Sequence, residues 1–249
     1  MRNLLLFLFC SLFLASCVAT SGTTRDLGGV WVDEQDRLYF LDEDGTLGLP
    51  GQTALSGVSW HLENGVLTLS TMDSPGGSVH ERKLVLKESR TGSLSFTDAE
   101  GASVTWKKSR ARVGRLEGTL FYRERMALPP QVVVHVQLFP LHSPIPVAVS
   151  IMPASGNGQL PFRVYYLEQT MDKEVRLAAA VLCSGETLFA TQNDENVTLP
   201  GSPRVLLYRT MPGEHQLPPL KTPASYKGTM HVGDRESSVR QPRSSMCQL

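Results

Sequence analysis

Residues 131–138 read Gln-Val-Val-Val-His-Val-Gln-Leu, and this stretch decides the fold class. Apolar residues alternate along it, and the four that share one face are Val132, Val134, Val136 and Leu138. The other face carries Val133, His135 and Gln137. A period of two is typical of a strand with one buried face, so we predict a half-buried strand. Residues 175–183 repeat the pattern and end at Cys183, which we expect to be a small buried residue rather than a nucleophile.

Further strands of this kind flank the stretch. Residues 116–122 alternate in polarity, and 161–166 form another short strand pattern. Between them Ala127-Leu128-Pro129-Pro130 cannot continue a helix, because proline lacks an amide donor and restricts the residue before it. We therefore expect a tight extended corner there and a β domain over residues 115–210.

The first half of the chain predicts a second set of short strands. Turn signals occur at Asp44-Gly45, Asn64-Gly65 and Glu100-Gly101, where glycine accepts the positive φ of a hairpin turn. About six strands at intervals of roughly ten residues favour a small antiparallel barrel or sandwich over residues 26–108. The predicted fold class is therefore all-β, with two small antiparallel β domains. Residues 109–114 are a basic linker, either an exposed connector or a contact with an anionic envelope polymer.

The N-terminus has the pattern of a bacterial lipoprotein signal. Arg2 precedes a short apolar segment, residues 4–14, which is too short to stay in a membrane as a helix. The signal-peptidase recognition residues are Leu14, Ala15 and Ser16, followed by Cys17. We predict that residues 1–16 are removed, that Cys17 carries the acyl chains, and that 17–25 form a tether. The alternative is an ordinary signal peptide in which Cys17 is incidental.

Composition excludes several function classes. The chain has 249 residues and a formal net charge of zero, which excludes an electrostatic nucleic-acid binder. Four cysteines without C-x-x-C spacing exclude a zinc ribbon or a thioredoxin-type pair. We find no catalytic motif and predict no catalytic residue, cofactor or metal. His61 and His80 are single histidines, and Asp42-Glu43-Asp44-Gly45 is expected to be a solvated hairpin tip rather than a calcium loop.

A family resemblance begins in the second domain. Its four landmarks, in chain order, are residues 118–130 with the valine-rich strand after them, 159–166, 176–179 and 185–191. They resemble the YbaY/YscW-type envelope lipoprotein domain. The resemblance implies a lipid-anchored, non-catalytic β-sandwich, some of whose relatives act as pilotins or chaperones for a type III secretion secretin. Residues 139–144 are apolar and proline-rich, whereas family members often carry an acidic pair there.

Two further resemblances concern the other parts of the chain. The first domain, from Gly29-Val30-Trp31 onward, is similar to small lipocalin-like and META-type envelope domains. In the tail, Thr222-Pro223-Ala224-Ser225-Tyr226 resembles the start of an NlpE-type barrel, without its Cys-x-x-Cys pair. We expect residues 211–249 to be a disordered stub. A Cys183–Cys247 bridge stays open, although a buried partner disfavours it.

Three hypotheses for function follow. The first is a lipoprotein of the outer membrane, facing the periplasm, that binds an envelope protein as an accessory or pilotin-like factor. Its location is implied by resemblance to enterobacterial sorting rules, in which Asp directly after the acylated cysteine keeps a lipoprotein in the inner membrane. This chain has Val18 at that position, so we expect the outer membrane. The second is a ligand-binding or stress-sensing lipoprotein with a cavity in residues 26–108. The third is a hydrolase of envelope polymer with paired carboxylates in a cleft. We adopt the first as the expectation.

Overall fold

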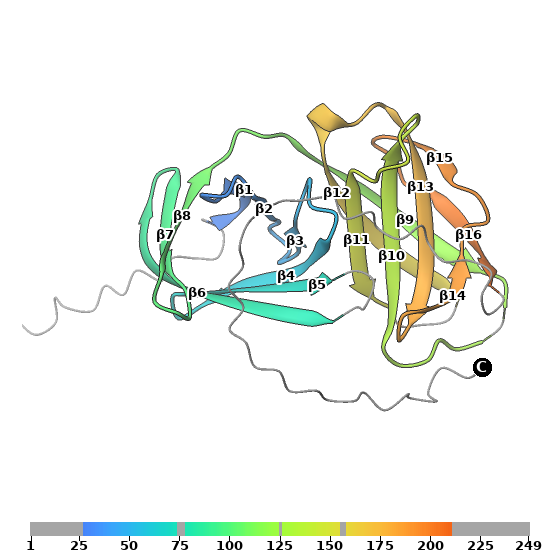
Figure 1. The fold of residues 1–249 in the computed structure, drawn as a ribbon, viewed down its shortest axis with the longest axis horizontal. Coiled ribbons are helices and arrows are strands. Elements are labelled where there is room, and N and C mark those ends of the chain that lie inside the picture. Colours follow the sequence, from blue (N-terminus) through green and yellow to red (C-terminus); the bar gives the residue numbers. More distant parts are fainter. Residues whose placement is uncertain (1–26, 74–77, 125, 155–157, 211–249) are drawn as a thin grey trace, which may run out of the picture.

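The computed structural model describes residues 27–73, 78–124, 126–154 and 158–210. Apart from short 3₁₀ turns, the regular structure of these residues is all β, and it forms two eight-stranded sheets (Figure 1). The predicted all-β fold with two β units is therefore confirmed. The predicted signal peptide 1–16, the anchor Cys17 and the tail 211–249 lie outside the described residues.

The first sheet forms unit 1 and is antiparallel throughout. Its strands are β1 (Gly29–Val32), β2 (Leu38–Leu41), β3 (Leu47–Gly48), β4 (Leu55–Glu63), β5 (Val66–Asp73), β6 (Val79–Arg90), β7 (Ser93–Thr97) and β8 (Ser103–Lys108). The order is β3-β2-β1-β8-β7-β6-β5-β4. A bridge between Thr46 and Ser59 brings the two ends of the sheet together, so unit 1 nearly closes into a barrel.

Aromatic side chains fill the interior of unit 1. All three tryptophans of the chain, Trp31, Trp60 and Trp106, are buried there. Trp106 stacks on Tyr39 with 4.4 Å between ring centroids. Closure also depends on Gly57, where a Cβ atom would lie only 2.2 Å from the carbonyl oxygen of Leu47. The backbones of β3 and β4 can approach this closely only because position 57 has no side chain.

The second sheet forms unit 2, a sandwich that curls on itself. Its strands are β9 (Val113–Tyr122), β10 (Val132–Pro140), β11 (Ala148–Pro153), β12 (Gln159–Leu167), β13 (Glu174–Cys183), β14 (Glu186–Ala190), β15 (Glu195–Thr198) and β16 (Arg204–Arg209). The order is β11-β10-β13-β14-β16-β9-β12, and β15 pairs with β13. One pair departs from the predicted antiparallel pattern, because β16 lies parallel to β9 after the chain crosses from β15.

The register of β10 and β13 confirms the inward face that the sequence predicted. Val134 lies opposite Val181 and Val136 opposite Ala179, and all four are at most 1% exposed. The other face of β10 was expected to be solvated, and this was wrong, because His135 and Gln137 are each only 2% exposed. Cys183 is buried as predicted, but it is disulfide-bonded rather than a lone thiol.

The two units meet along β4, β5 and β11, which lie side by side in the middle of the molecule (Figure 1). Met72 of unit 1 packs with Val149 and Ile151 of unit 2. The backbone N–H of Ile151 donates a hydrogen bond of 2.9 Å to Ser56 Oγ. Since β8 ends at Lys108 and β9 begins at Val113, only residues 109–112 connect the two sheets.

Candidate binding recess between the two units

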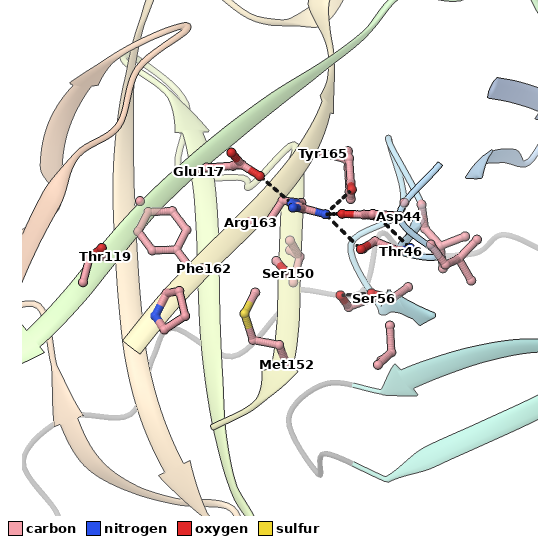
Figure 2. Close-up of a pocket in the computed structure, with 18 of the residues that line it drawn as sticks. Asp44, Thr46, Ser56, Glu117, Thr119, Ser150, Met152, Phe162, Arg163 and Tyr165 are labelled. Carbon is pink, nitrogen blue, oxygen red and sulfur yellow. Dashed lines mark hydrogen bonds and ion pairs between the residues drawn. The ribbon is translucent and has the colours of Figure 1, made fainter. Parts of the chain in front are cut away.

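A recess of about 480 Å³ opens between the units (Figure 2). The turn before β3 and strands β3 and β4 form one wall, and β9, β11 and β12 form the other. The apolar lining comprises Leu47, Leu49, Val58, Val149, Met152, Pro161 and Phe162. The polar lining comprises Asp44, Thr46, Ser56, Glu117, Thr119, Ser150, Arg163, Tyr165 and Ser202. The ligand-binding hypothesis placed a cavity inside residues 26–108, whereas this recess needs both units.

The acidic turn of unit 1 lies against unit 2. Asp42 Oδ2 accepts a 2.7 Å hydrogen bond from the Tyr165 hydroxyl and one of 3.1 Å from Arg115 Nη1. The Asp42 side chain is only 14% exposed. The expectation of a solvated hairpin tip therefore holds for Glu43 and Asp44, which are exposed, but not for Asp42, whose carboxylate has partners more than 70 residues away in the chain.

Arg163 of β12 bonds to several of the polar side chains that line the recess, and we call this polar lining the polar rim. Its Nη1 donates to Asp44 Oδ2 at 2.5 Å and to Thr46 Oγ1 at 2.9 Å, both in unit 1. Its Nε donates to Glu117 Oε1 at 2.7 Å on the neighbouring strand β9. One guanidinium thus joins carboxylates of both units, as Figure 2 shows. Such charge-assisted bonds are stronger than bonds between neutral groups.

The ring of Tyr165 packs against Gly48 of unit 1, where a larger residue would leave no room for it. A Cβ atom at Gly48 would lie 2.8 Å from ring carbons of Tyr165. The same ring meets Phe40 edge-on, with centroids 5.2 Å apart. The tyrosine therefore contributes both an apolar contact and, through its hydroxyl, the hydrogen bond to Asp42.

The polar rim holds its charges in fixed states. Burial raises the pKa of Asp44, but hydrogen bonds from Arg163 and Thr46 outweigh it and lower the pKa to about 2. Burial lowers the pKa of Arg163, but its bonds to Asp44 and Tyr165 outweigh this and raise it. Burial and the hydrogen bond to Asp42 raise the pKa of Tyr165. At neutral pH the Arg163 side chain is therefore a cation, the Asp44 side chain an anion and the Tyr165 phenol neutral.

This arrangement is suited to binding. Asp44 accepts a bond from Arg163 that helps to lower its pKa, whereas a general acid at neutral pH needs a raised one. Within the described ranges, no group of three or more His, Cys, Asp and Glu side chains could hold a metal ion. The recess has apolar side chains at its floor and polar groups around it. A peptide segment could place its apolar side chains on the floor and hydrogen-bond its backbone to the polar rim.

The site residues predicted from the sequence do not lie in this recess. Leu14, Ala15, Ser16 and Cys17 fall outside the described residues, so their role stays a prediction. His61 is exposed on β4, and His80 lies 3.7 Å from Asp73 with its side chain 59% exposed. Among the described residues, no helix is long and apolar enough to cross a membrane.

Sequence reasoning missed the recess because its walls come from separate units. The signal was present as polar side chains on alternating positions: Glu117 lies on one predicted strand with Arg115 just before it, and Arg163 and Tyr165 lie on another. Cross-strand register places Arg163 opposite Glu117 and Tyr165 opposite Arg115. The charged outward face of β9 and β12 did not by itself indicate that unit 1 packs against it, because charged strand faces are usually exposed to solvent.

Comparison with known proteins connects unit 2 to a described family. The family model "Type III secretion system lipoprotein chaperone (YscW)" matches residues 111–207. Comparison with curated proteins finds no match. The remaining resemblances, of unit 1 and of the tail, stay predictions.

Two solved structures are similar to parts of the chain. One is an alternative pilotin from the type II secretion system of Vibrio cholerae, with 23% identity and a TM-score of 0.37, covering 40% of this chain and 99% of that one. The other is a lipocalin-like protein from Bacteroides thetaiotaomicron, with 22% identity and a TM-score of 0.30, covering 34% of this chain and 97% of that one. The family match extends from just before β9 into β16, so unit 2 is the part of this chain that is similar to the YscW lipoprotein chaperones.

Proposed function

We propose that this chain is a non-catalytic, pilotin-like chaperone module that binds another protein of the bacterial envelope. The observation that carries this is the YscW match over residues 111–207, which coincides with the folded unit 2. The name of that family supports a partner from a secretion system, and a secretin is the class of partner we propose. Anchoring through acyl chains on Cys17, in the outer membrane, is part of the same proposal.

The recess between the units is the surface that we assign to the partner. Apolar side chains of an extended segment would contact Met152 and Phe162, and its backbone would bond to the more accessible Thr119 or Ser202. The volume of about 480 Å³ accommodates a few side chains, not a folded domain. This supports recognition of a short segment of the partner.

The test is affinity isolation of the acylated protein from detergent-solubilised envelopes. A Cys17→Ser variant removes the proposed anchor and serves as the reference for localisation. We expect one stoichiometric envelope protein to co-purify with the parent chain, identified by mass spectrometry. Its absence, with the bait still in the outer membrane, would count against the chaperone proposal.

A matched pair of variants assigns the binding surface. Thr119→Trp fills the recess from its outer wall, since Thr119 lines it on β9. Thr105→Trp places the same side chain on β8, at a half-buried position that does not line the recess. We expect only Thr119→Trp to reduce recovery of the partner. Equal recovery with both variants would move the binding surface away from the recess.

A small apolar ligand is the second candidate, because about 480 Å³ lies within the range of ligand pockets. The discriminating measurement is fluorescence of an apolar dye, titrated into the parent chain and the two tryptophan variants. Saturable dye binding that Thr119→Trp abolishes, together with no protein partner, would favour the ligand over the chaperone role.

A further inference from the structure

The stretch that connects the two units is strongly basic. Residues 107–115 contain no acidic residue, and their bases are Lys107, Lys108, Arg110, Arg112 and Arg115. The stretch comprises the end of β8, residues 109–112 and the start of β9, and we call it the basic connector. Figure 1 shows it crossing from unit 1 to unit 2 along one margin of the molecule. In a chain without net charge, this is a local excess of positive charge.

Two of the five bases have partners within the folded units. Lys108 Nζ donates a 2.5 Å hydrogen bond to the carbonyl oxygen of Gly28 and lies 4.6 Å from the centroid of the Trp31 ring. Burial lowers the pKa of this amine. Arg115 Nη1 donates to Asp42 Oδ2 at 3.1 Å. These two side chains attach the connector to unit 1.

The other three bases, Lys107, Arg110 and Arg112, are exposed. The neighbouring Trp106 is buried in the core of unit 1, so the alternation of β8 directs Lys107 outward. Exposure also alternates from residue 109 to 113, which places Arg110 and Arg112 on the same side of the extended connector.

These three exposed bases lack counter-ions in the protein. Within the described ranges, no carboxylate forms an ion pair with any of them. The acidic residue Glu168 contacts the connector through its backbone N–H, which donates 3.1 Å to the carbonyl of Arg112. The three positive charges therefore face the surroundings of the molecule.

The basic connector lies beside the residues through which the chain enters unit 1. The N–H of Ser109 donates 2.9 Å to the carbonyl of Val30, and Lys108 bonds to Gly28. The proposed anchor Cys17 is ten residues before Leu27, the first described residue. Ten residues span at most about 35 Å. Acyl chains on Cys17 would therefore keep the connector close to the membrane that holds them.

We propose, on the basis of the acyl anchor in the proposed function, that the basic connector binds the anionic phospholipid surface of the same membrane. Each Lys or Arg near such a surface strengthens partitioning by about fivefold. The acyl chains limit the distance between the folded units and the bilayer. The connector adds a second contact, which fixes the orientation of the units on the bilayer.

A lipid surface fits the exposed bases better than a discrete anionic ligand does. The residues lie on a strand end and an extended connector, and of the described residues that line the recess none belongs to the connector. A small anion needs several donors that converge on it, whereas a bilayer offers charge over a wide area. The connector can bind the bilayer while a partner segment occupies the recess, because the two surfaces share no residue.

The test is sedimentation with lipid vesicles, using the mature chain 17–249 with Cys17→Ser so that no acyl group contributes. The vesicles contain phosphatidylcholine alone or mixed equally with phosphatidylglycerol. We expect partitioning onto the anionic vesicles to be at least about tenfold stronger at low salt, and to be lost at about 0.5 M salt. Equal partitioning onto both vesicles, or none, would overturn this inference and leave the chaperone proposal to its own test by affinity isolation.

A matched pair of triple variants assigns the contact to the connector. The first combines Lys107→Gln, Arg110→Gln and Arg112→Gln. The control also removes one lysine and two arginines at exposed positions of β6 and β16, with Lys83→Gln, Arg204→Gln and Arg209→Gln. We expect the first to weaken partitioning at least about tenfold and the control less than about twofold. Equal losses would indicate a response to net charge alone and would overturn the assignment.

Acetylation of lysines in the acylated chain, followed by mass spectrometry, locates the contact on the vesicle. We expect Lys107 to react more slowly on phosphatidylglycerol vesicles than on phosphatidylcholine vesicles, while the exposed Lys83 reacts equally on both. Protection of Lys83 alone would place another face on the membrane and contradict the proposal. Binding of the Cys17→Ser chain to soluble dextran sulfate but to neither vesicle would assign the connector to an anionic envelope polymer instead.

Discussion

The ion pair of Arg163 and Asp44 allows a direct test of whether charged contacts stabilise the interface between the two units. The perturbation is a double-mutant cycle with Arg163→Met and Asp44→Asn. Each change removes one charge of a pair whose Nη1 and Oδ2 atoms lie 2.5 Å apart across the interface. The cycle isolates their coupling from the other bonds of each residue, provided that neither single variant creates a new contact.

The expected coupling is about 1 kcal/mol. A pKa lowered from 3.8 to about 2 at Asp44 corresponds to about 2 kcal/mol of preference for the carboxylate in the folded chain. The side chains of Arg163 and Asp44 are 27% and 47% exposed, and screening by water roughly halves that figure. Because the folded pKa is depressed, the contribution is full above pH 3.8 and is lost as the pH falls toward 2.

The assay is urea unfolding of the full chain carrying Cys17→Ser, followed by tryptophan fluorescence and far-UV circular dichroism. All three tryptophans lie in unit 1, so fluorescence reports the unit that supplies Asp44. Arg90 and Glu88 serve as the matched control, because they form a 2.6 Å pair inside unit 1 with side chains 74% and 49% exposed. Their coupling should stay below about 0.5 kcal/mol.

Additive effects of Arg163→Met and Asp44→Asn, within about 0.3 kcal/mol, would refute the reasoning. They would show that the ion pair does not couple the units, and the interface would then depend on the apolar contacts of Met72 and Tyr165. A coupling that persists unchanged at pH 2.5 would refute the assignment of the charge to Asp44.

Three further predictions concern packing and pH. Gly57→Ala should lower the free energy of unfolding by about 3 kcal/mol or more in urea denaturation, since its Cβ would meet the Leu47 carbonyl at 2.2 Å. Gly48→Ala should destabilise by about 1–3 kcal/mol, and Tyr165→Ala should suppress that penalty if ring overlap causes it. Burial lowers the pKa of His135 from 6.5 to about 4, so the unfolded chain binds its proton first as the pH falls. The free energy of unfolding should therefore decrease by up to about 3 kcal/mol between pH 6.5 and 4, and His135→Leu should remove that slope; an identical slope in the variant would contradict it.

The sequence was sufficient to predict most strands of unit 1 and four of the eight in unit 2, β9, β10, β12 and β13. Alternation in residues 131–138 and the glycine turns of unit 1 are local features, and they determine strand faces and hairpins without knowledge of the partner strand. The register of Val134 with Val181 confirms the predicted core face. The same pattern failed on the opposite face, because whether His135 is exposed depends on what lies over the sheet, not on its period.

The recess could not be predicted in this way. Its rim joins Asp44 to Arg163 across 119 positions of the chain, and no periodicity connects residues at that separation. Glycine is equally uninformative in sequence: Gly65 has open space around it, whereas Gly48 receives the ring of Tyr165. Motif reasoning did find the YscW-like landmarks, and the family match over residues 111–207 confirms that resemblance.

Unit 1 completes the recess on unit 2, the part of the chain that matches the YscW family model. The matched residues 111–207 contribute Phe162, Met152 and Arg163 to the recess, but the facing wall, Leu47 to Leu49 and Ser56 to Val58, lies wholly outside them. Without unit 1, Arg163 would keep Glu117 and lose Asp44 and Thr46, and the outward face of β12 would be an open surface. A concave site surrounds a bound segment on more sides than a flat sheet does, and buries more of its apolar area. In the proposed function, selectivity for a partner therefore resides in the pairing of the two units, and we expect variants at their interface to alter partner binding even where unit 2 stays folded.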